Sequence, residues 1–174
     1  ALVFATRFLP GPLQLDSGEA GAVPVDVRTA WNKLASGEGT LATAGPLWQL
    51  VAAIFLHAGP DHLLFNMIML WPFGLLAARH LGPAAMIAAF LLCGICGNVV
   101  QVVLNSDSTI PIVGASGAIS GLQGIYLCMA LRWELPDPDV WPLAHAIPPM
   151  QLGVFAIAGF AFDAYSLMNH AQGI

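Results

Sequence analysis

The sequence predicts an all-α, polytopic membrane protein because its charge is low and its apolar runs are long. Of its 174 residues, 57% are hydrophobic and 9% are charged, whereas about a quarter of the residues in a soluble domain are charged. Apolar runs around 62–78, 83–104, 116–131 and 147–162 each approach the ~20 residues that cross a ~30 Å hydrocarbon core. With incomplete apolar segments at both ends, these runs predict a single membrane domain over 1–174.

The N-terminal part combines an incomplete helix with a long loop. Residues 1–9 are apolar around Arg7; this interruption argues against a cleavable signal, and the prolines that follow end the helix. Residues 10–59 are mixed and glycine-rich, so we expect a long outer loop with short helices, one of them near 27–34. A loop of this length is more often functional than idle.

Prolines and charged residues mark the ends of the following helices. Pro60 fits the first turn of a helix and Asp61 suits its positive N-terminal end, while Pro83 opens the next helix. Polar residues at 105–111 predict a return loop. We therefore expect helices over about 60–79, 83–104 and 116–132, a fifth span from about 148 and a last one from about 167.

The distribution of charge predicts how the chain lies in the membrane. Arg79 and Arg132 end the second and fourth predicted spans. Since positive residues in short loops favour the cytoplasmic side, the loop over 10–59 is expected on the opposite side. The net charge of −5 forms no basic patch, so nucleic-acid binding is not expected.

A row of small residues lies along the fourth predicted span. Gly117, Gly121 and Gly124 are spaced i, i+4, i+7, and such a stripe lets a neighbouring helix approach to backbone contact. Ser116 stands at the head of the stripe. It lies about 24 Å along the helix from Arg132, less than the thickness of the hydrocarbon core, so we expect it inside the membrane. Stripes of this kind with a serine also occur in helices that only pack.

Four polar residues near the outer ends of the predicted helices suggest acyl-transfer chemistry. Intramembrane ionisable residues are by default candidates for function. Ser116 would be the nucleophile and His170 the general base; Asn66, His62 and the backbone N–H at the serine could stabilise the oxyanion. The alternative for His62 and Asn66 is a structural role in capping and cross-linking helices. Asp163 is a weak third member of the triad, since we expect it in the turn before the last helix.

Two other kinds of chemistry are disfavoured. A metal site would use His57, Asp61, His62 and His170, but the chain lacks a His-Glu-x-x-His motif and Asp61 sits at a helix start, so we expect neither a metal nor a cofactor. The Cys-x-x-Cys spacing at 93–96 lies inside an apolar run without a strand–helix context, which favours a packing role over redox chemistry.

Three motifs together resemble those of the rhomboid family of intramembrane serine proteases. The resemblance covers the chain from about Trp48 to its end and implies a six-helix transmembrane bundle with a Ser–His dyad and no aspartate; the first and last helices are incomplete in this chain. The motifs occur in the family's order on the second, fourth and sixth spans: His57-x4-His62-x3-Asn66, Gly114-x-Ser116-Gly117 and Asn169-His170-x-x-Gly173.

The resemblance implies a role for each matching residue. Ser116 and His170 would form the dyad, and His62 and Asn66 would serve the oxyanion hole. His57 would be structural, and Gln49 and Ser120 stand where many members have arginine and an aromatic residue. Phe65 and Leu152 would line a lateral gate between the second and fifth helices, and Gly117, with Gly121 in the same stripe, would pack the fourth helix against Gly173 of the sixth.

These observations lead us to expect an intramembrane serine endopeptidase that cleaves transmembrane segments of other membrane proteins. Its catalytic core would be residues 60–174, in contact with the lipid bilayer of a bacterial cell membrane, with the active site opening to the outer side. The alternative is a catalytically inactive rhomboid-like protein that binds membrane clients. The presence of both Ser116 and His170 favours the protease.

Overall fold

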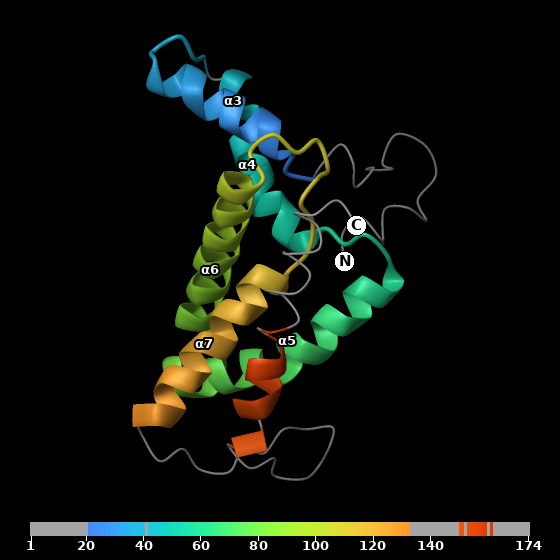
Figure 1. Ribbon diagram of the computed structural model, residues 1–174. Helices are drawn as coiled ribbons and strands as arrows, with labels where there is room; N and C mark the ends of the chain where they lie inside the picture. Colours follow the sequence, from blue (N-terminus) through green and yellow to red (C-terminus); the bar gives the residue numbers. More distant parts are fainter. Residues whose placement is uncertain (1–20, 41, 133–149, 152, 160, 162–174) are drawn as a thin grey trace, which may run out of the picture.

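The computed structural model describes residues 21–40, 42–132, 150–151, 153–159 and 161. The regular elements of this part are helices (Figure 1), as the sequence predicts. The predicted first and sixth spans and most of the loop before the fifth span lie outside the described residues. The count of six spans therefore stays a prediction.

Two short helices form the described part of the predicted outer loop. α3 (Pro24–Ala35) begins with a proline and has Asp26 in its first turn and Lys33 in its last, an arrangement that complements the helix dipole. It confirms the short helix expected near 27–34. α4 (Gly45–Ala52) is flanked by 3₁₀ turns at Ala42–Ala44 and Ala53–Phe55.

α5 (Pro60–Leu81) and α6 (Pro83–Leu104) are 22 residues each and confirm the expected second and third spans. Each begins with a proline, whose missing N–H is not needed in the first turn. Gly82 separates the helices with φ +84°, a backbone conformation that favours glycine. Among the described helices, these two are long and apolar enough to cross a membrane.

α5 contains a proline in its interior, at Pro72. Proline donates no backbone hydrogen bond, and its ring crowds the carbonyl four residues earlier, so helices bend there. The two halves of α5 run in different directions in Figure 1. The axis of α5 therefore changes direction at Pro72.

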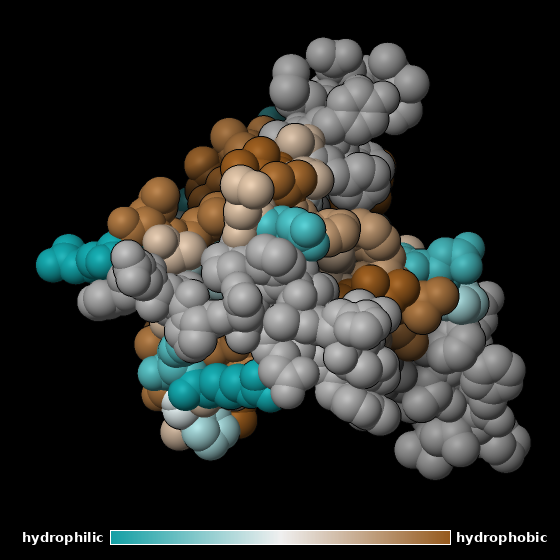
Figure 2. Space-filling model, turned by 90° about the horizontal axis from the view of Figure 1, so that it is seen from below, coloured by the Kyte–Doolittle hydropathy of each residue, from teal (hydrophilic) through white to brown (hydrophobic). Residues whose placement is uncertain are grey.

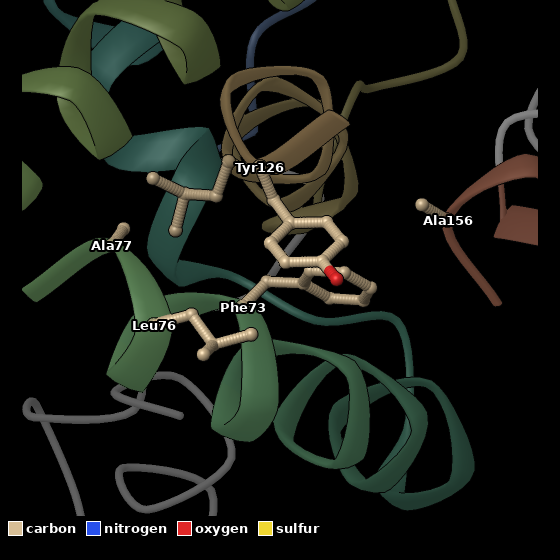
Figure 3. Close-up of a cluster of buried hydrophobic side chains, with 6 residues drawn as sticks. Phe73, Leu76, Ala77, Tyr126 and Ala156 are labelled. Atoms are coloured by element: carbon tan, nitrogen blue, oxygen red, sulfur yellow. The ribbon is translucent and has the colours of Figure 1, made fainter. Parts of the chain in front are cut away.

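α7 (Ser116–Arg132) has 17 residues and begins at the serine that the sequence singles out. The C-terminal half of α7 packs on the second half of α5. The rings of Phe73 and Tyr126 meet edge to face with their centroids 5.9 Å apart. Their neighbours complete the α5–α7 core (Figure 3), whose buried members are Phe73, Leu76, Ala77, Leu122, Tyr126 and Ala156.

α6 and α7 approach each other at backbone distance. A Cβ added at Gly97 would lie 3.2 Å from the Cα of Gly117, and one added at Gly121 would overlap the Cβ and Sγ of Cys93. Gly117 and Gly121 of the glycine stripe thus lie against α6 in the described part of the chain. Gly173, the expected partner of Gly117, lies outside the described residues.

The outer loop is fastened to α6 and to the segment before α7. Asn98 of α6 donates a hydrogen bond of 2.7 Å to the carbonyl of Leu50. Ala22 and Ile112 exchange backbone hydrogen bonds of 3.2 and 2.8 Å, and buried apolar side chains surround these contacts. Those side chains belong to Ala22, Val27, Leu50, Ala53 and Val102.

Large apolar side chains remain exposed on the helices. On the face drawn in Figure 2, exposed apolar surface lies between several polar groups. An exposed apolar surface of this extent suits contact with lipid rather than water. On α6 alone the exposed large apolar residues are Ile87, Leu92, Val99, Val100, Val103 and Leu104.

Candidate active site

Ser116 is the first residue of α7 and is half-buried. Just before it, Gly114 has φ +120° and donates a backbone hydrogen bond of 2.8 Å to the carbonyl of Ala53, which fixes the entry of the chain into the helix. The first N–H groups of a helix have no partner within it and carry partial positive charge. Ser116 therefore stands where backbone donors can stabilise a developing negative charge.

The ring of His62 lies against the backbone of Gly114. A Cβ added at Gly114 would lie 2.7 Å from Cε1 and 2.9 Å from Nε2 of His62. Both the positive φ and this close contact require glycine. The structure thus brings His62 of α5 to within two residues of Ser116, as the sequence motifs predict.

His62 is oriented from its other side. The backbone N–H of Ala58 donates to Nδ1 of His62 over a long distance of 3.5 Å, and the ring of His57 packs edge-on at a centroid distance of 5.3 Å. When Nδ1 of a neutral histidine accepts a hydrogen bond, the proton resides on Nε2. This assignment makes Nε2, the atom beside Gly114, a donor.

His57 is held neutral by its surroundings. It is 5% exposed, and burial lowers its pKa from 6.5 to about 4, with a further contribution from His62. An uncharged His57 places no positive charge beside His62 at neutral pH. In this position it supports the ring of His62.

Asn66 lies one turn after His62 on the same face of α5. It is 2% exposed, and its Nδ2 donates a hydrogen bond of 2.9 Å to the backbone carbonyl of His62. An amide nitrogen has two hydrogens, so one remains after this bond. The other can be directed toward the pocket that Asn66 shares with Ser116.

This pocket, of about 250 Å³ including space open to the surroundings, lies between the first half of α5 and α7. Phe65, a predicted gate residue, is 49% exposed and lines it. Gly159, on the helical segment of the predicted fifth span, closes it on another side. The lining residues are Phe65, Asn66 and Met69 from α5, Ser116, Ile119, Ser120 and Gln123 from α7, and Gly159.

Sequence reasoning did not single out Gln123 as part of the site. Gln123 is 1% exposed and lies two helical turns after Ser116, with Ser120 between them. The signal was present in the sequence, because three polar residues at i, i+4, i+7 share one face of an otherwise apolar helix.

Several predicted site residues lie outside the described residues, so their geometry is untested. They are the proposed base His170, the gate residue Leu152, the packing residue Gly173 and the weak triad candidate Asp163. Within the described part of the chain, no group of three or more His, Cys, Asp or Glu side chains could hold a metal ion. The three cysteines are free thiols, and Cys93 packs against Gly121.

Residues 44–174 match the family model described as the Rhomboid domain. The chain is 36% identical over 155 residues to "Putative rhomboid protease YdcA" of Bacillus subtilis (strain 168), covering 88% of this chain and 75% of that protein. It is 38% identical over 94 residues to "Rhomboid protease GluP" of the same strain, covering 54% of this chain. It is 36% identical over 104 residues to "RHOMBOID-like protein 5" of Arabidopsis thaliana, covering 59% of this chain.

The matches differ in how much of each relative they cover. The chain spans only 18% of GluP and 34% of RHOMBOID-like protein 5. No solved structure shows a significant match to the chain.

Proposed function

Because the chain belongs to the rhomboid family and is an integral membrane protein, we propose that it is an intramembrane serine endopeptidase that cleaves transmembrane segments of other membrane proteins. The observation that carries this proposal is the position of Ser116, which begins α7, has the ring of His62 beside the preceding turn and faces a pocket shared with Asn66. The names of several relatives as rhomboid proteases support it.

In the proposed reaction, the hydroxyl of Ser116 attacks the scissile carbonyl while His170 accepts its proton. His170 then protonates the leaving amine, and water hydrolyses the acyl-enzyme with His170 again acting as base. Oxyanion stabilisation would come from the N–H groups at the start of α7, from Nε2 of His62 and from the amide of Asn66. Preorganised donors of this kind often supply the largest single share of rate acceleration.

Substrates would enter between α5 and the fifth span, past Phe65 and Leu152. The exposed ring of Phe65 at the pocket supports this route. We place the opening on the outer side of a bacterial membrane, on the basis of Arg79 and Arg132 at the opposite helix ends and the tendency of such residues to be cytoplasmic.

Labelling with a fluorophosphonate probe tests the proposal. Protein solubilised in detergent should react with the probe and cleave a transmembrane substrate, and Ser116→Ala should lose both, with turnover reduced by about 10³-fold or more. The unfolding free energy should change by less than about 1 kcal/mol, because the serine is half-buried beside a pocket. His170→Ala should also abolish turnover.

Ser36→Ala is the matched control, since Ser36 is exposed at the end of α3 and its hydroxyl donates to the nearby carbonyl of Lys33. This variant should label and cleave like the wild type. Cleavage retained by Ser116→Ala would remove Ser116 as the nucleophile. Binding of membrane segments without any labelling or cleavage would instead identify an inactive family member.

A further inference from the structure

Gln123 carries a buried acceptor that has no hydrogen-bond partner among the described residues. Its Oε1 is inaccessible and unpaired, although the side chain is 1% exposed. Buried side-chain acceptors are nearly always satisfied, because leaving one without a partner costs stability. An unpaired amide oxygen therefore needs a physical explanation.

The position of Gln123 supplies that explanation. It lines the same pocket as Ser116, about 10 Å further along α7. Side chains on a helix lean toward its N-terminus, so the amide lies closer to Ser116 than the backbone spacing indicates. A substrate residue next to the scissile bond could reach it.

The walls of the pocket define which side chain fits. Phe65, Met69 and Ile119 offer apolar surface, and no acidic or basic side chain is among the described lining residues. Among the described lining residues a charged substrate side chain would find no counter-ion, and burying a charge is costly at membrane depth. An apolar one would leave Oε1 of Gln123 unsatisfied.

We propose that this pocket is a substrate subsite and that Gln123 selects an uncharged side chain carrying a hydrogen-bond donor, such as Asn, Gln, Ser or Thr, beside the scissile bond. The donor of the substrate would supply the partner that Oε1 lacks in the structure. This inference rests on the proposed protease function, because it assigns the preference to the site around Ser116.

The contact with Gly159 fits this role. A Cβ added at Gly159 would lie 2.8 Å from Nε2 and 3.0 Å from Oε1 of Gln123. The amide of Gln123 therefore packs directly on the backbone of the predicted fifth span, where a larger residue would displace it. The glycine fixes one side of the amide and leaves the pocket side for a ligand.

The test uses transmembrane substrates that differ only at the three positions on each side of the cut. At one of these positions, wild-type protein should prefer Asn or Thr over Leu by about tenfold in kcat/KM, the effect expected of one buried hydrogen bond. Gln123→Met preserves the length of the side chain but removes the acceptor, and it should abolish this preference. Gln101→Met makes the same change on α6, outside the pocket, and should keep it.

A second variant separates recognition from folding. Gln123→Asn retains the acceptor but withdraws it by one methylene, so the preferred donor should change from Asn to the longer Gln. An unchanged preference in Gln123→Met or in Gln123→Asn would overturn the proposal, as would the absence of any position that favours donors. Reduced stability of Gln123→Met with unchanged discrimination would identify a structural link instead.

Binding to Ser116→Ala keeps this test independent of cleavage. Competition between Asn- and Leu-containing segments should show the same preference of about tenfold, and adding Gln123→Met should remove it. If the wild type cuts nothing but this preference is found, the protease proposal fails and the subsite remains. Equal binding of the two segments would overturn the subsite even if cleavage occurs.

Discussion

The two faces of α7 are built in opposite ways. Toward α6, Gly117 and Gly121 bring the backbones together, and a Cβ added at Gly121 has no space beside Cys93. Toward α5, Ser116, Ser120 and Gln123 border a pocket. At Gly121 the first face thus excludes even a methyl group, while the second face borders a pocket.

This contrast shows how a membrane protein can position a reactive group without a large apolar driving force. Helix association in lipid depends on close packing, so the α6 face can fix the position of α7. The adjacent face is then free to carry polar groups and to border a pocket. The variants below test whether the face toward α6 holds α7 in position while the face toward α5 carries the groups needed for activity.

The largest effect is expected for Asn66→Ala, which removes a donor from the pocket side. Turnover should fall by about 10²–10³-fold, the usual loss for one oxyanion donor, without being abolished. Measuring turnover per probe-labelled serine separates this effect from loss of folded protein.

Asn98→Ala is the matched control, because Asn98 is also a buried asparagine bonded to a backbone carbonyl but lies on α6 away from the pocket. It should lose activity only in proportion to folded protein. Unchanged turnover per labelled serine in Asn66→Ala would remove Asn66 from the site.

A branched side chain on the closed face should cost stability. Gly121→Val would force its methyl groups against Cys93, and overpacking of this kind costs typically about 1–3 kcal/mol. Ser120→Val places the same side chain on the preceding residue, at the pocket, and should cost less. Thermal unfolding in detergent measures both; equal melting temperatures for the two variants would mean that the faces of α7 are not different.

Low pH should lower the unfolding free energy of the protein, because His57, which packs against His62, becomes protonated. The pKa of His57 is lowered to about 4 in the folded protein, so protonation favours the unfolded chain. Stability should be full above about pH 6.5 and fall as the pH decreases toward 4. His57→Gln should lose most of this pH dependence, whereas His80→Gln, at an exposed position on α5, should keep it. The same acid sensitivity in His57→Gln would contradict the assignment.

The smallest effect is expected at the surface contact between the outer loop and the segment leading to α7. Arg28 and Asp107 form an ion pair of 2.6 Å between exposed side chains. Such pairs contribute about 0.2–1 kcal/mol, and a double-mutant cycle with Arg28→Met and Asp107→Asn should give a coupling energy in this range that decreases in high salt. A coupling of several kcal/mol would show that the outer loop holds Ser116 in place more firmly than surface charges usually allow.

The helices could be predicted from the sequence because their signals are local. Prolines at Pro60 and Pro83 and the glycine at Gly82 mark the ends of α5 and α6, and the expected boundaries agree with the structure to within two residues at each end. The i, i+4 spacing also placed His62 and Asn66 on one face of α5. Each of these inferences depends on residues a few positions apart.

Contacts between distant segments could not be predicted in the same way. The pairing of Ala22 with Ile112 and the bond from Asn98 to Leu50 depend on how helices pack. The glycine stripe on α7 predicted a close neighbour, which the family resemblance implied to be the sixth span, whereas the contact with α6 was not expected. The spacing of Gln123 with Ser116 and Ser120 predicts a shared polar face, but only the packing of the helices shows that this face borders a pocket.

Pro72 makes α5 easier to bend at one turn than elsewhere along the helix. The proline leaves the carbonyl of Ile68 without its usual helical donor, so the helix is most compliant at that turn. Phe65 and Asn66 lie before this hinge, whereas Phe73 lies after it in the α5–α7 core. The half of α5 that lines the pocket can therefore tilt while the other half stays anchored, and the elastic cost of admitting a substrate falls on a single turn.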